Sequence, residues 1–153
     1  IRDSVASRGL GDVYKRQLFN TVFAKATSAQ YADLAENYSG DAVYEPGTVV
    51  HFGGSQEVTL CDEDMCRRVA GVVSTNPAYL MNSHLQGIAT PVALQGRVPC
   101  KVRGTVRLGD MMVSAGNGFA RAEADPTLGS VIGKALADFD GIEGVIEVVV
   151  GRV

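Results

Sequence analysis

The chain has 153 residues, of which 46% are hydrophobic and 20% are charged, a composition typical of one globular domain rather than a disordered chain. Its net charge is −3 and it contains no basic block, which argues against a nucleic-acid partner. No apolar run approaches the roughly 18 residues of a membrane span, and no signal-peptide pattern is present. Three cysteines, an odd number, argue against a disulfide framework and favour synthesis in a reducing compartment.

The beginning of the chain predicts no part of the fold. Residues 1–17, IRDSVASRGLGDVYKRQ, lack sustained periodicity and resemble translated sequencing-adapter read-through, so we expect a non-native lead. We expect residues 18–30 to be the end of an upstream stem or a linker. Since the first residue is not Met, we expect a fragment of a longer protein, and we assign residues 31–153 to a C-terminal β-domain.

A short helix is predicted at Tyr31–Tyr38. Its apolar side chains follow the i, i+3, i+4, i+7 spacing of one helix face: Tyr31, Leu34, Ala35 and Tyr38. Two turns of helix are marginal alone, so we expect this segment to dock on the rest of the domain.

The remaining sequence predicts short strands separated by Gly-containing turns. Strands are predicted at residues 48–52, 57–60, 68–74, 90–94, 97–103, 111–115, 119–124, 131–137 and 145–150. The segment 78–86 is predicted as a loop with room for one helical turn, and Gly116-Asn117-Gly118 as a turn with positive φ. The predicted fold class is therefore all-β, a small barrel or sandwich of short antiparallel strands with one short N-terminal helical turn.

Asp33 and Glu36 are the candidate catalytic residues. On a helix, positions i and i+3 are neighbours, and two close carboxylates can share one proton because like charges raise one pKa. The alternative is a pair of solvated acids near a helix start, where the dipole favours negative charge. Spacing alone favours the solvated pair.

The cysteines offer a second candidate site. Cys61 and Cys66, spaced C-x4-C, can be combined with His51 and His84 around zinc. Structural zinc sites usually add a second matching pair of ligands, whereas Cys100 stands alone. The sequence therefore favours small buried cysteines, and we predict no metal and no cofactor.

A longer set of motifs carries a resemblance. The chain contains, in this order, ATSAQYADLAENYSGDAVYEPGTVVHFGG, RVAGVVSTNPAYLMNS, VALQGRVPCKV, GDMMVS and VIGKALADFDGIEGVIEVVVGRV. Together these segments resemble the C-terminal domain of tail-fibre and appendage virion structural proteins of tailed phages, over nearly all of residues 26–153. The resemblance implies a virion protein, made in the host cytoplasm, whose terminal domain helps three chains trimerise and fold below an upstream stem.

The residues Ala32–Glu36 and Gly71–Pro77 are also similar, more distantly, to the autocleaving intramolecular chaperone domain of phage neck-appendage proteins, a glutamic-peptidase-like family. This resemblance places Asp33 and Glu36 on the acidic motif of that family. It implies, as an alternative function, self-cleavage near the N-terminal boundary of the domain. The chain departs from the family pattern at Leu34, where the family has an aromatic residue.

A trimeric cap agrees with the absence of a pocket motif in the sequence. In such a cap, apolar strand faces beyond the core of one subunit bury against symmetry mates. A third function, from another class, is a capsid-decorating or glycan-binding β-module. It predicts exposed aromatic side chains on one loop face, such as Tyr79 and Phe119. The sequence does not identify a host receptor.

Overall fold

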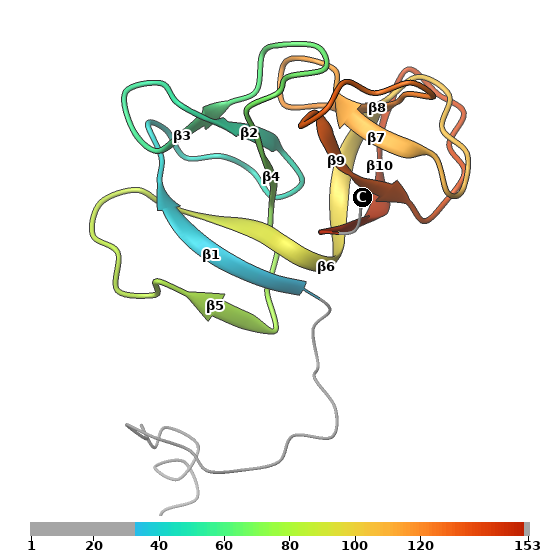
Figure 1. Cartoon of the computed structure of the whole chain (residues 1–153). Helices are drawn as coiled ribbons and strands as arrows, with labels where there is room; N and C mark the ends of the chain where they lie inside the picture. The colour runs from blue at the N-terminus through green and yellow to red at the C-terminus, as the bar shows by residue number, and fades with distance from the viewer. Residues whose placement is uncertain (1–32, 152–153) are drawn as a thin grey trace, which may run out of the picture.

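The computed structural model describes residues 33–151, and every regular element in this range is a strand (Figure 1). The strands are β1 (Asp33–Ser39), β2 (Val49–Phe52), β3 (Val58–Leu60), β4 (Val69–Val73), β5 (Tyr79–Met81), β6 (Ala89–Arg103), β7 (Met111–Ser114), β8 (Ala120–Ala122), β9 (Val131–Ala135) and β10 (Glu143–Val150). The all-β prediction is confirmed. Residues 33–151 contain no helix that could cross a membrane. The predictions for residues 1–17 and 18–30 lie outside the described residues.

The C-terminal strands close into a five-stranded barrel. Strands β6, β8, β7, β9 and β10 pair in this order, and β10 pairs again with β6, so the hydrogen-bonded circuit is complete. The pairing of β10 with β6, which closes the barrel, runs from Glu143 opposite Arg103 to Val150 opposite Gly96. Closure leaves these strands without a free edge. We call β6–β10 the barrel.

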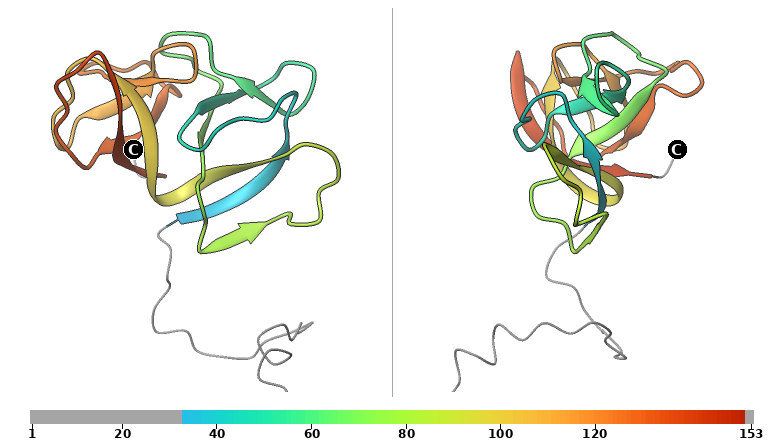
Figure 2. Two further views of the ribbon diagram at one scale, coloured as in Figure 1. Left: turned by 180° about the vertical axis from the view of Figure 1, so that it is seen from behind. Right: turned by 90° about the vertical axis from the view of Figure 1, so that its left-hand side faces the viewer.

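The remaining strands, β1 to β5, form an open half beside the barrel. Strand β4 pairs with β6 and β2, and β2 pairs with β3. Strand β1 pairs antiparallel with the first part of β6 and parallel with β5. The fifteen-residue β6 therefore belongs to both halves, and the views from the front and from behind show it passing between them (Figures 1 and 2).

Two groups of buried side chains make the core. The larger lines the barrel and continues into the open half; it includes Val98, Val102, Met112, Ile146 and Val148, together with Val49, Val72, Cys61 and Cys66. The smaller lies within the open half and consists of Val50, Val58, Val73 and Val92. Successive valines of β2 and β4 enter different groups, so both strands are buried on both faces. This explains their nearly continuous apolar sequences.

The helix predicted at Tyr31–Tyr38 is wrong, because residues 33–39 form β1. Burial along β1 alternates with a period of two, and the buried residues are Asp33, Ala35 and Asn37. Strands on both sides, β5 and β6, provide ladder partners for the β1 backbone. The apolar residues follow the helical spacing and not the alternation of a strand, since Leu34 and Tyr38 lie on the face opposite Ala35, yet pairing with two neighbours decides for the strand.

The turns and strand limits agree with the sequence in most places. The β2–β3 hairpin and the positive φ values of residues 116–118 are as predicted. Two details differ. The predicted loop 78–86 contains β5, and the strands predicted at 90–94 and 97–103 are one strand. The bend or bulge expected between them at Gln95-Gly96 is a bulge, where the partners of Leu34 and Ala35 are Gln95 and Ala93. The pairs β1–β5 and β6–β8 are parallel rather than antiparallel.

Candidate functional site

Strand β1 places the two predicted catalytic carboxylates on opposite faces. Side chains alternate along a strand, so positions three apart point in opposite directions. Asp33 is 7% exposed, and its Oδ2 atom has no hydrogen-bond partner within residues 33–151. Glu36 is half-buried and accepts a hydrogen bond from the hydroxyl of Tyr38 at 2.9 Å. The adjacent pair expected on a helix is not formed, and the catalytic role of the two residues stays a prediction.

The face of β1 that carries Glu36 is packed by aromatic side chains. The ring of Tyr38 meets the ring of Phe52 edge to face, with centroids 5.4 Å apart, and covers the smaller core group. Burial, followed by the hydrogen bond to Glu36, raises the pKa of the Tyr38 hydroxyl. This surface stabilises the open half rather than forming a polar cleft.

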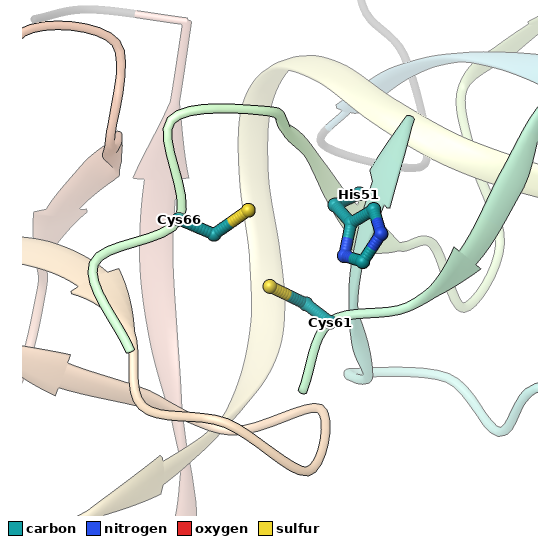
Figure 3. A group of neighbouring side chains, drawn as sticks. All are labelled: His51, Cys61 and Cys66. Carbon is teal, nitrogen blue, oxygen red and sulfur yellow. The ribbon is translucent and has the colours of Figure 1, made fainter. Parts of the chain in front are cut away.

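A second cluster brings together His51, Cys61 and Cys66. One ligand-bearing atom from each side chain lies within 4.8 Å of the other two, and all three residues are buried. His51 lies in β2, Cys61 directly follows β3, and Cys66 lies in the loop that leads to β4. In Figure 3 the two sulfur atoms and one ring nitrogen of His51 point toward a common centre. Two thiols and an imidazole so placed are a ligand set for a soft metal ion.

The polar surroundings of the cluster are incomplete. The Nδ1 atom of His51 is buried and has no hydrogen-bond partner among the described residues. The thiol of Cys61 donates a weak hydrogen bond to the Glu63 carbonyl at 3.7 Å, and burial raises the pKa of this thiol to about 11. The pKa of the Glu63 carboxyl is lowered by a hydrogen bond from the Cys66 thiol and by Arg68.

The barrel holds the loop that carries the two cysteines. We call residues 61–68 the cysteine loop. The Cys66 amide donates to the Ser114 hydroxyl at 2.8 Å, and the Gly118 amide donates to the Cys61 carbonyl at 2.8 Å. Arg121 pairs with both carboxylate oxygens of Asp64, at 2.7 and 2.9 Å. The cluster is therefore positioned by both halves of the molecule.

Three of the four candidate zinc ligands named from the sequence lie in this cluster, and the fourth candidate, His84, does not. His84 is exposed in the segment after β5 and takes no part in the cluster. Cys100 is buried separately in β6, where burial raises the pKa of its thiol to about 12. All three cysteines have free thiols in the structure.

The predicted β2–β3 hairpin could have identified His51, rather than His84, as the histidine of the cluster. In the observed register His51 lies opposite Thr59, and the Cys61 amide donates to the Val49 carbonyl at 3.1 Å. His51 and Cys61 are therefore diagonal neighbours on one face, a distance that long side chains can bridge.

Exposed apolar side chains gather at one edge of the open half. Strand β5 pairs with β1 alone among the described strands, and its residues Tyr79 and Leu80 are 65% and 36% exposed. Ile88, just before β6, is also exposed. Phe119, predicted to share a loop face with Tyr79, instead precedes β8 and is half-buried beneath the Arg103 guanidinium, 4.3 Å from the ring centroid. The two aromatic residues therefore do not form one loop surface.

Comparison with known proteins does not place the chain in a family. No protein-family model matches the sequence, and no curated protein matches it.

Proposed function

We propose that this domain is a structural module of a phage virion, at the C-terminal end of a tail fibre or appendage, where it helps three chains to trimerise and fold. The order of the motifs over residues 26–153, which resembles that of such proteins, supports the virion role. The all-β fold is compatible with it. The observation that carries the proposal is the exposed apolar edge at β5, because such an edge favours pairing with another chain.

The position of this edge suits a domain joined to an upstream stem. Strands β1 and β5 are parallel, with Leu34 opposite Tyr79, so the exposed ring of Tyr79 lies beside the start of β1. A stem that joins the domain at Asp33 therefore attaches next to the β5 edge. Three domains held on one stem axis would bring their β5 edges close together, where Tyr79, Leu80 and Ile88 can be buried between subunits.

The test is the oligomeric state of the purified chain by sedimentation equilibrium. We expect a trimer for the wild type and dissociation for Tyr79→Lys, because the substitution places a charge in the proposed interface. The matched control is Leu128→Lys, which changes a side chain that is 90% exposed in the segment between β8 and β9. The control is expected to remain trimeric.

A wild-type chain that is monomeric at every accessible concentration contradicts the proposal. Equal dissociation of the two lysine variants contradicts the assignment of the interface to β5. Circular dichroism of each variant confirms that the β-fold is retained.

Self-cleavage is the second candidate function, and one observation favours it. Asp33, at the start of the domain, buries a carboxylate oxygen that has no partner within residues 33–151, an unusual arrangement for a purely structural acid. The test is expression of a precursor with its upstream stem. Cleavage that is lost in Asp33→Ala and Glu36→Ala supports the role, and processing of both variants at the wild-type rate removes it.

A further inference from the structure

We propose that His51, Cys61 and Cys66 bind a zinc ion that cross-links the open half and holds the cysteine loop in place. The three ligand atoms already lie within 4.8 Å of one another. In a tetrahedral zinc site, bond lengths of about 2.3 Å to sulfur and about 2.0 Å to nitrogen separate the ligand atoms by roughly 3.5–3.8 Å. Each side chain therefore needs to move inward by no more than about 1 Å.

The ligand chemistry selects the ion. Two thiolates and one imidazole suit zinc, whereas magnesium and calcium require oxygen ligands. Two cysteine thiolates also balance the charge of a divalent cation, so the buried centre is neutral with an uncharged histidine. Glu63 lies in the same loop, and its carboxylate, which is outside the group of ligand atoms within 4.8 Å, would turn toward the ion to complete the tetrahedron. Arg68 pairs with Glu63 at 2.6 Å and offsets its charge.

The unpartnered nitrogen of His51 is the second, independent observation. A buried polar atom without a hydrogen bond costs about 1–3 kcal/mol. In residues 33–151 only three buried side-chain atoms lack a partner, and one of them is Nδ1 of His51. A bond from this nitrogen to zinc removes the deficit. Cys100, by contrast, belongs to no such group of ligands among the described residues, and burial alone raises the pKa of its thiol, as for an ordinary core residue.

The site's position indicates a structural role. The three ligands come from β2, the end of β3 and the approach to β4, and the cysteine loop contacts the barrel through Ser114 and Gly118. A bound ion therefore joins three segments of the open half and fixes the surface that docks on the barrel. This inference does not depend on the virion role, because a metal site can exist in a monomer.

The experiment uses the reduced full chain, freed of metal by a chelator, and titrates it with Co²⁺ alone. We expect one Co²⁺ per chain, with a thiolate-to-cobalt charge-transfer absorption that added Zn²⁺ abolishes. Cys66→Ala and His51→Gln are expected to weaken binding by more than the roughly 10- to 100-fold that loss of an outer-shell partner costs. The matched controls, Cys100→Ala and His84→Gln, retain the absorption and the affinity.

Thermal unfolding gives a readout that needs no variant. Zinc is expected to raise the Tm of the wild type, because a ligand that binds the folded state alone stabilises it. A wild type that binds no cobalt and whose Tm zinc does not raise overturns the proposal. So does a loss of binding in Cys100→Ala equal to that in Cys66→Ala, or a Cys61–Cys66 disulfide that persists in reductant.

Discussion

The barrel and the open half differ in how the edges of their strands are paired. The five barrel strands form hydrogen bonds with one another in a closed circuit, and the larger core group fills the barrel interior. The open half has a core group of four buried valines and leaves β3 and β5 as edges within residues 33–151. A closed barrel is stable by itself, whereas an open sheet requires support from outside its own strands.

Within residues 33–151 that support comes from two places. The first part of β6 pairs with β1 and β4, and the cysteine loop is tied to the turn between β7 and β8. We propose a metal ion and two further subunits as the other supports. The comparison teaches that both proposed functional surfaces lie where the sheet is incomplete, and the following predictions test it.

Truncation of the barrel core is expected to have the largest effect on stability. Met112 is fully buried in the larger core group, and Met112→Ala should lower the free energy of unfolding by about 2–5 kcal/mol. Val58→Ala, in the smaller group, removes fewer atoms from a site nearer an edge strand and should cost less. Urea unfolding of both variants measures the difference. A larger decrease in the free energy of unfolding for Val58→Ala than for Met112→Ala would contradict the prediction, because the open half would then contribute more to stability than the barrel.

A methyl group at Gly133 is expected to disturb the closure of the barrel. A Cβ atom at this position of β9 would collide with the backbone of β10 at Val149. We expect Gly133→Ala to destabilise by about 3 kcal/mol, the upper end of the cost of overpacking, because a backbone neighbour cannot turn away. The exposed neighbour Lys134 provides the control, since Lys134→Ala should change stability by less than about 0.5 kcal/mol. Equal urea midpoints for the two variants would contradict the close approach.

Gly118 tests the contact between the two halves. Its φ is +74°, and a Cβ atom there would lie 2.7 Å from Thr48 and 2.8 Å from Leu60. Gly118→Ala should cost about 2 kcal/mol, from backbone strain and from the displaced side chains. Gly104→Ala is the matched control, because Gly104 has a similar φ of +71° and no neighbour within 4 Å. The excess cost of Gly118→Ala in thermal unfolding measures the docking contact, and its absence would contradict that contact.

The smallest effect is expected at an exposed ion pair of the barrel. The bidentate hydrogen bond from Arg107, at 2.8 and 2.9 Å, lowers the pKa of the Asp140 carboxyl. A carboxyl whose pKa is lower in the folded state stabilises the fold above its unfolded pKa, near 4, and loses this effect as the pH falls through the folded value. Asp140→Asn should therefore lower the stability slightly at pH 7 and should reduce the loss of stability in acid by the same small amount. An unchanged acid dependence of the urea midpoint would contradict this.

The sequence predicted most strands because their apolar runs and glycine turns are local signals. The apolar run at residues 68–74 indicated a central strand, and β4 has partners on both sides. Gly116-Asn117-Gly118 indicated a positive-φ turn because the signal lies in the three residues themselves. Strand β1 was missed because its apolar residues follow the spacing of a helix, while two of the three residues it buries, Asp33 and Asn37, are polar. The partners β5 and β6, both distant in sequence, decide for the strand.

The candidate sites required information that is not local. The sequence offered Cys61 and Cys66 as candidate zinc ligands but favoured buried cysteines, and the choice between His51 and His84 depends on strand register. Asp33 and Glu36 are three residues apart in either conformation, yet a helix makes them neighbours and a strand separates them. The exposed edge at β5 was hidden because a three-residue strand in a predicted loop has no periodicity to detect.

The central claim is that the β5 edge of the open half is completed by other copies of the chain. Hydrogen exchange, followed by mass spectrometry in dilute and concentrated protein, tests it directly. The account predicts that amides of the barrel strands exchange slowly at both concentrations, while peptides covering Tyr79–Met81 become protected only in the concentrated sample. Exchange of β5 at one rate, whatever the concentration, would contradict it.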